Sequence, residues 1–200
     1  MASDAFPDVM VLLGSPRKGG NADALAGAFL EPAEDRDLSI ERVRIADLDF
    51  EPCRGCHACE GRGECIQKDA MQDLYPKLLH ARWILLASPV FFYNVPGKTK
   101  SFIDRAQALW ARKYTPPGGE KGPVPISEPG RKGFAVACGA TQGKNLFKGL
   151  EWTVRYFFDA IDVSHEGLYG VRGLEDKGDA AKKPGALDGA REAGRAFFME

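Results

Sequence analysis

Four of the five cysteines lie close together in the chain, in the pattern C-x2-C-x2-C-x5-C formed by Cys53, Cys56, Cys59 and Cys65. Two successive spacings of two residues place the first three sulfurs around a small volume, as in ferredoxin-type loops, and the fourth thiolate can close the set. The pattern therefore suits an iron-sulfur cluster. It differs from the ferredoxin pattern, in which the last spacing is three residues and a proline follows, because Ile66 follows Cys65 here.

Two other uses of these cysteines stay open. Structural zinc sites usually take their ligands from two knuckles that are well separated in the sequence, whereas these four cysteines lie within one short segment. Free thiols with a redox role are the other alternative. His57 lies inside the segment, and a single loop histidine is expected to be solvated rather than ligating. The tight spacing is poor geometry for disulfides that hold a fold together, so a reducing compartment is indicated.

A second group of chemistry-bearing residues, GSPRKGGN, follows an apolar run and precedes a helical pattern at residues 22–29. Backbone N–H groups and the positive end of the helix dipole converge at such a junction, which favours an anion. Ser15 and Asn21 add neutral donors and Arg17 a charged one, so a monophosphate site is predicted. The glycines match neither the Walker motif nor G-x-G-x-x-G. The alternative is an ordinary turn in which Asn21 caps the helix.

The elements that must position these loops alternate along the chain. Short apolar runs predict five strands, at residues 9–13, 38–45, 83–87, 134–138 and 163–171. The first and third lack polar alternation, as is typical of parallel strands covered on both faces. Helical stripes lie between the runs, and the last helix is expected at residues 185–198. This order predicts a doubly wound five-stranded parallel α/β sheet with helices on both faces, whose ligands lie beyond the carboxyl ends of the strands.

Composition and charge limit the function classes. The 200 residues, 44% of them hydrophobic, are expected to form one domain, residues 1–200. A net charge of -1 with both signs spread along the chain gives no basis for nucleic acid or membrane binding. The N-terminal segment resembles no signal peptide or membrane anchor, so a cytoplasmic location is expected.

Two insertions and a few single residues complete the sequence predictions. The Cys-rich insertion spans about residues 51–67, and a Pro/Gly-rich loop spans about residues 114–130. Pro76 is expected to kink or begin its helix, and residues 177–183 are expected to form an exposed loop. Lys98, Lys100 and Arg105 are expected to form a solvated helix face. Cys138 ends a buried strand and is expected to pack in the core.

Three segments together carry a resemblance to a known family: GSPRKGGNA, SPVFFYNVPGKTKSFIDR at residues 88–105, and ACGATQG at residues 137–143. In order and spacing they resemble the flavodoxin-like NAD(P)H-dependent FMN reductases. The second segment is the most diagnostic, because a strand that ends in Ser-Pro and leads through an aromatic turn into P-G-x-x-K-x-x-I-D-R is unusual. The resemblance implies a flavodoxin-like fold and FMN as the cofactor, with NAD(P)H as a possible co-substrate.

The resemblance also implies the residues that hold FMN. The phosphate would be bound by Ser15, Arg17, Gly20 and Asn21. The isoalloxazine would be lined by Pro89, Val90, Phe91, Phe92, Tyr93 and Asn94, with Gly139, Ala140, Thr141 and Gly143 on its other wall. A flat amphipathic ring system favours such aromatic, apolar and backbone amide contacts. No catalytic side chain is named, since the cofactor carries the chemistry.

Three functions are consistent with these residues. The first is an FMN-dependent oxidoreductase that transfers electrons between NAD(P)H and a small-molecule acceptor such as a quinone or a flavin. The second is an iron-sulfur flavoprotein, a branch of the same family that the cysteine spacing resembles, with a [4Fe-4S] cluster on the four cysteines and a ferredoxin-like carrier as partner. The third is a redox- or metal-sensing binding module without turnover. The resemblance further implies a homodimer or homotetramer.

Overall fold

The five strands of the computed structural model form one parallel sheet. The structure describes residues 6–116, 118–119 and 123–199. The strands are β1 (Val9–Leu13), β2 (Ile40–Arg44), β3 (Trp83–Pro89), β4 (Lys132–Gly139) and β5 (Ser164–Arg172). Every neighbouring pair is parallel, and the order is β2-β1-β3-β4-β5. This is the flavodoxin-like order, so the predicted fold class is confirmed.

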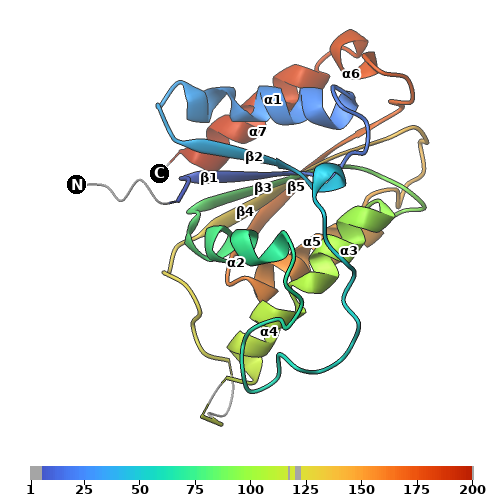
Figure 1. Cartoon of the computed structure of the whole chain (residues 1–200). Helices are drawn as coiled ribbons and strands as arrows, with labels where there is room; N and C mark the ends of the chain where they lie inside the picture. Colours follow the sequence, from blue (N-terminus) through green and yellow to red (C-terminus); the bar gives the residue numbers. More distant parts are fainter. Residues whose placement is uncertain (1–5, 117, 120–122, 200) are drawn as a thin grey trace.

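Helices cover both faces of the sheet. They are α1 (Asn21–Glu34), the 3-10 turn η1 (Ile45–Asp47), α2 (Met71–His80), α3 (Gly97–Arg105), α4 (Gln107–Tyr114), α5 (Lys148–Ala160), α6 (Asp179–Lys182) and α7 (Ala186–Phe198). Figure 1 shows α1, α6 and α7 on one face and α2 to α5 on the other. None of the described helices is long and apolar enough to cross a bilayer.

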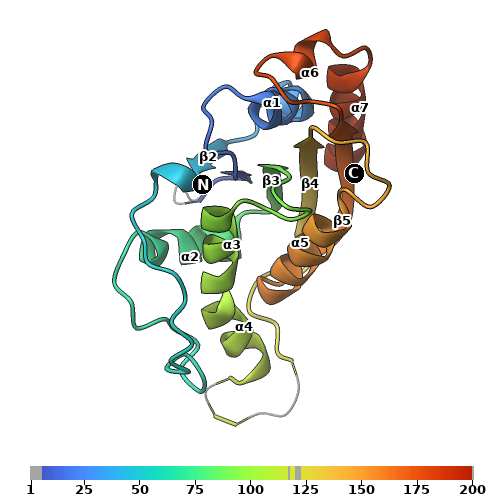
Figure 2. The ribbon, with the colours of Figure 1, turned by 90° about the vertical axis from the view of Figure 1, so that its right-hand side faces the viewer.

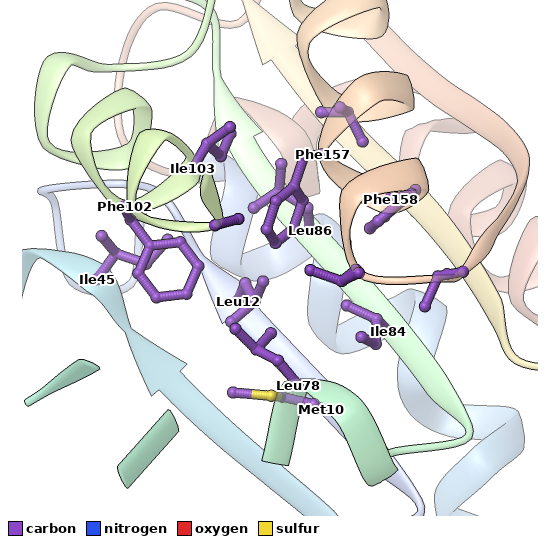
Figure 3. Packing of buried hydrophobic residues seen from close by; sticks show 14 of the residues in the cluster. Met10, Leu12, Ile45, Leu78, Ile84, Leu86, Phe102, Ile103, Phe157 and Phe158 are labelled. Atoms are coloured by element: carbon purple, nitrogen blue, oxygen red, sulfur yellow. The ribbon is translucent and has the colours of Figure 1, made fainter. Parts of the chain in front are cut away.

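The core lies on the two faces of the central strands, because β1 and β3 are apolar on both sides. On the α2 to α5 face, Met10 and Leu12 of β1 belong to one buried cluster with Leu78 of α2, Phe102 of α3 and Phe157 of α5 (Figure 3). A second cluster fills the space between the sheet and the α1 and α7 layer. These two layers hold the strand ends, and so the loops that follow them, in fixed positions.

Some sequence predictions differ from the structure in detail. Pro76 lies inside α2, which begins at Met71, so the prediction that it could begin this helix is wrong. The prediction of an exposed loop at residues 177–183 is also wrong in part, because α6 lies there and Ala180 is fully buried. Residues 48–70 contain no helix or strand, as expected for the Cys-rich insertion. The predicted Pro/Gly-rich loop lies partly outside the described residues, at 117 and 120–122.

Close packing of α1 against α7 gives a test of this layer. A Cβ on Gly194 of α7 would lie 2.0 Å from the backbone oxygen of Phe29 in α1, so a side chain there must force the helices apart. We expect Gly194→Ala to lower the free energy of unfolding by about 1–3 kcal/mol, measured by urea denaturation. Gly27→Ala is the control, because Gly27 is exposed in the middle of α1 with no atom near its missing Cβ. It should stabilise by up to about 1 kcal/mol. Equal stabilities of the two variants would contradict the packing described.

Candidate functional site: two separate cavities

The predicted phosphate loop connects β1 to α1, beside the point where the strand order reverses between β1 and β3. Ligands of open parallel sheets bind at this edge, beyond the carboxyl ends of the strands. The N-cap of α1 is Gly20, and no side chain caps the helix. The N–H groups of the first turn therefore remain for a ligand.

Internal hydrogen bonds hold the phosphate loop in shape. The hydroxyl of Ser15, which is buried, accepts from the Arg17 N–H at 3.1 Å. Arg44 at the end of β2 donates to the carbonyl oxygen of Ser15 at 3.1 Å and pairs with Asp23 at 2.6 Å. Asp23 in turn accepts from the Gly19 N–H at 2.7 Å. The loop is therefore braced from β2 and α1.

A segment after β5 closes over the phosphate loop. The side-chain amide of Asn21 donates to the Asp176 carbonyl at 2.9 Å, and its oxygen accepts from the Ala180 N–H at 3.1 Å. Arg17 donates to the Glu175 carbonyl at 3.3 Å, and Lys177 donates to a carbonyl of the phosphate loop. Asn21 thus anchors the C-terminal segment, which the sequence did not indicate.

The aromatic turn after β3 is a tight, strained hairpin. Phe91 and Asn94 exchange backbone hydrogen bonds of 2.8 and 3.0 Å. The two residues between them, Phe92 and Tyr93, have φ values of 47° and 62°. Positive φ at both central positions usually calls for Asn-Gly, and an L-residue with a side chain pays about 1–2 kcal/mol for it. Strain of this kind clusters at ligand sites.

A cavity of about 220 Å³ lies between these loops and the end of β4. Its walls include nine residues of the predicted FMN set: Ser15, Arg17, Gly20, Asn21, Pro89, Val90, Phe91, Gly139 and Ala140. Other members of that set are not among its lining residues: Phe92, Tyr93, Asn94, Thr141 and Gly143. Ligand cavities usually measure about 300–1,000 Å³, so this one can enclose only part of FMN.

Six lining residues were not predicted as cofactor contacts, and two of them, Pro16 and Ala22, adjoin predicted residues of the phosphate loop. Leu174, Glu175 and Lys177 come from the segment after β5, and Cys138 ends β4. Lys177 adds a second cation to the cavity that Arg17 lines. Its ammonium lies next to Gly19 of the phosphate loop, 3.3 Å from where a Cβ on that glycine would be. Cys138 is buried as expected, and burial raises the pKa of its thiol to about 12. It is therefore a neutral packing group at neutral pH.

The four clustered cysteines line a different cavity, of about 420 Å³. Its opposite wall is the junction of α3 and α4, where Asp104, Arg105, Gln107 and Ala108 lie. The cysteine loop runs alongside α3 and α4 in both views (Figures 1 and 2). The two cavities share no lining residue. The cysteine cavity lies at the C-terminal end of α3, whereas no residue of α3 lines the first cavity.

The thiols share this cavity without forming a finished metal site. Cys53 and Cys56 are exposed, and Cys59 and Cys65 are half-buried. Within the described residues, no three His, Cys, Asp or Glu side chains converge closely enough to hold a metal ion as they stand. His57 is exposed and pairs with Glu60, consistent with the solvated role expected for it.

Arg105 corrects the sequence prediction of a solvated helix face. Its side chain is 1% exposed and forms two hydrogen bonds with the Asp69 carboxylate, of 2.5 and 3.1 Å. It also donates to the Glu51 carbonyl at 2.7 Å. The pair therefore ties both ends of the cysteine loop to α3. Burial alone would raise the pKa of Asp69, but hydrogen bonds from Arg105 and from two backbone N–H groups lower it overall.

Removing this carboxylate should destabilise the protein. We expect Asp69→Asn to cost about 3–5 kcal/mol in urea denaturation at neutral pH, because it leaves the Arg105 cation buried without its partner. Since the pKa of Asp69 is lower in the folded chain, its contribution is present above the unfolded pKa, near 4, and is lost as the pH falls through the folded pKa. The difference between wild type and variant should therefore shrink in acid. Glu34→Gln is the control, because it breaks an exposed ion pair with Arg42 and should lower the free energy of unfolding by at most about 1 kcal/mol. An equal loss in both variants would contradict a buried role for the ion pair between Asp69 and Arg105.

Comparison with known proteins identifies the family. The family model described as NADPH-dependent FMN reductase matches residues 7–147. The chain belongs to this family. The resemblance inferred from the three segments is thereby confirmed, and the chain is a member of a family of flavin-dependent oxidoreductases. The match includes the phosphate loop, the cysteine loop and the aromatic turn, but ends before β5 and Lys177.

Relatives of this FMN reductase family member add detail. An iron-sulfur flavoprotein of Archaeoglobus fulgidus is 40% identical over 94 residues, which are 47% of this chain and 43% of that protein. An iron-sulfur flavoprotein of Methanocaldococcus jannaschii is 33% identical over 155 residues, which are 75% of this chain and 70% of that protein. The chain thus spans less than half of the first relative and about two thirds of the second.

A solved structure supports the fold of this family member. The NAD(P)H:quinone oxidoreductase from Methanothermobacter marburgensis superposes with a TM-score of 0.70 over 96% of both chains, at 16% identity. At this identity the likeness concerns the fold alone.

Proposed function

We propose that this chain is an iron-sulfur flavoprotein, an FMN-dependent oxidoreductase whose four clustered cysteines hold a [4Fe-4S] cluster. Through this cluster the protein would exchange electrons with a ferredoxin-like carrier. The observation that carries the proposal is the division of the predicted residues between two cavities. One is formed by the phosphate loop, the start of the aromatic turn and the end of β4, and the other contains all four cysteines. The names of the two archaeal relatives agree with this division.

The residues of the first cavity fit FMN. Ser15, Arg17 and the first N–H groups of α1 would bind the phosphate, and Lys177 adds charge. Pro89, Val90 and Phe91 offer apolar and backbone contacts to the ring. When bound, FMN supplies hydride and single-electron chemistry. The protein groups then have only to bind and orient the cofactor and its reactant.

The residues of the second cavity fit a cluster. The donor set is four thiols, and thiolates are the ligands of iron-sulfur clusters. Two buried polar atoms of this cavity's residues, Arg105 Nε and Gln67 Oε1, have no hydrogen-bond partner among the described residues. Metal sites commonly complete their geometry only on binding, which accounts for thiols that share a cavity without converging. A bound cluster would supply one-electron exchange.

A second candidate function is supported by a different observation. Because Cys53 and Cys56 are exposed and the thiols do not converge, the chain could work without a cluster. It would then be an FMN-dependent enzyme that transfers electrons from NAD(P)H to a small acceptor such as a quinone or a flavin. Under either function we infer a homodimer or homotetramer, since Phe92 is fully exposed beside a cavity too small to enclose FMN.

Purification without oxygen, followed by quantitation of FMN, iron and acid-labile sulfide per chain, tests both candidates. A brown protein with about four iron atoms per chain and a visible band that bleaches with dithionite supports the cluster. A yellow, iron-free protein supports the second candidate. A colourless protein that rejects added FMN would overturn both.

A further inference from the structure

Arg105 occupies an unusual position beside the cysteine cavity. It is 1% exposed, one of the largest completely buried side chains, and it lines the cavity where α3 ends. Arginine is almost never fully buried unless it is paired. Its burial therefore calls for an account of every donor on its guanidinium.

The pairing with Asp69 satisfies only one side of that guanidinium. The two terminal nitrogens donate to Asp69 and to the Glu51 carbonyl. The Nε–H is also buried, but it has no partner among the described residues. A buried donor without an acceptor costs about 1–3 kcal/mol, so an unsatisfied one needs an explanation.

The cysteine loop supplies the missing type of acceptor. Cys65 lines the same cavity as Arg105, and a thiolate there would raise the pKa of Arg105. Thiolate and sulfide sulfurs accept hydrogen bonds from N–H groups, and a [4Fe-4S] cluster with four thiolates carries net negative charge. Such hydrogen bonds and nearby positive charge raise the reduction potential of a cluster.

We infer that the Nε–H of Arg105 donates a hydrogen bond to a sulfur of the iron-sulfur group held by the four cysteines, and that it raises the reduction potential of that group. The inference rests on the proposed cluster. Asp69 and the Glu51 carbonyl accept from the terminal nitrogens of Arg105, so Nε is the nitrogen of this guanidinium that is left without a partner among the described residues. The same side chain thereby links the C-terminal end of α3 to the cluster.

Arg105→Lys tests this assignment, because lysine keeps a positive charge for Asp69 but lacks the planar fork and its Nε–H. Wild type and variant are purified without oxygen, and the cluster is titrated with dithionite while its visible absorption is followed. The variant should hold the same iron and FMN per chain, with its midpoint potential shifted to a more negative value. The matched control is Arg112→Lys on α4. Arg112 packs against Gly63 of the same loop but does not line the cavity. The midpoint potential of the cluster in Arg112→Lys should therefore equal that of wild type.

Each other outcome is decisive. An unchanged potential in Arg105→Lys overturns the inference, and would agree with pairing of Nε to Gln67 Oε1 instead. Loss of iron with FMN and circular dichroism unchanged also overturns it, since Arg105 would then only brace the loop. Wild type without iron overturns the inference together with the cluster proposal, and is distinguished by the wild-type assay alone.

A second measurement covers a variant that does not fold. A chain that keeps Arg105 is labelled with 15N-arginine, and the reduced cluster is examined by pulsed electron paramagnetic resonance. Arg54 also lines the cavity, so the measurement uses an Arg54→Lys background. A 15N coupling to the cluster supports the inference, and its absence overturns it.

Discussion

Replacing Cys56 with alanine is expected to remove most of the iron from the protein purified without oxygen, while FMN stays bound at the wild-type level. Cys56 is the middle cysteine of the two short spacings, so its loss leaves no adjacent pair at a spacing of two residues. The flavin should be unaffected because the two cavities share no lining residue. Colorimetric iron and released FMN, both per chain, measure the result.

His57→Asn is the matched control for this experiment. His57 adjoins Cys56 in the same loop, and its φ of 57° is one that asparagine tolerates. Its imidazole is exposed and paired with Glu60, so iron should stay at the wild-type level. If Cys56→Ala kept its iron, the thiols would not be the ligands. If it lost FMN as well, the two cavities would not be independent.

The sequence predicted the parts of the fold and site that depend on local patterns. The runs that became β1 and β3 are apolar on both faces, which already indicates a parallel sheet covered by helices. The phosphate loop and the aromatic turn directly follow these strands, so the topology alone brings them to the same edge. That is why most of the predicted FMN residues line one cavity.

The parts that the sequence did not predict depend on contacts between distant segments. Arg105 lies on a helix with Lys98 and Lys100 and resembles a solvated residue; its partner Asp69 is 36 positions away. Lys177 reaches the phosphate loop only because α6 packs against α1, where Asn21 is hydrogen-bonded to the Asp176 and Ala180 backbone. No motif records such contacts. The polar residues at residues 173–178, directly after a strand, were the one available signal for the segment that closes over the cavity.

Removing both cations from the phosphate end of the first cavity should weaken FMN binding and leave riboflavin binding unchanged. Arg17 belongs to the phosphate loop near the start of the chain, and Lys177 comes from the segment after β5. Both side chains line the same cavity. Charge-assisted hydrogen bonds contribute about 1.5–3 kcal/mol each, and both side chains reach solvent, so the lower end applies. Arg17→Ala with Lys177→Ala should therefore raise the Kd for FMN on the order of 100-fold. Titration of the flavin-free protein by fluorescence quenching measures both ligands.

Riboflavin separates a phosphate contact from a collapse of the cavity, because it has the same ring and ribityl chain without the phosphate. Asn21→Ala should weaken both ligands, since its amide holds the Asp176 and Ala180 backbone that closes the cavity. Lys182→Ala removes an exposed cation from α6 that does not line the cavity, so both Kd values should stay at wild type. If the double variant weakened riboflavin as much as FMN, the two cations would shape the cavity rather than bind phosphate. If it weakened neither, the phosphate would bind elsewhere, and the assignment of the loop between β1 and α1 would be wrong.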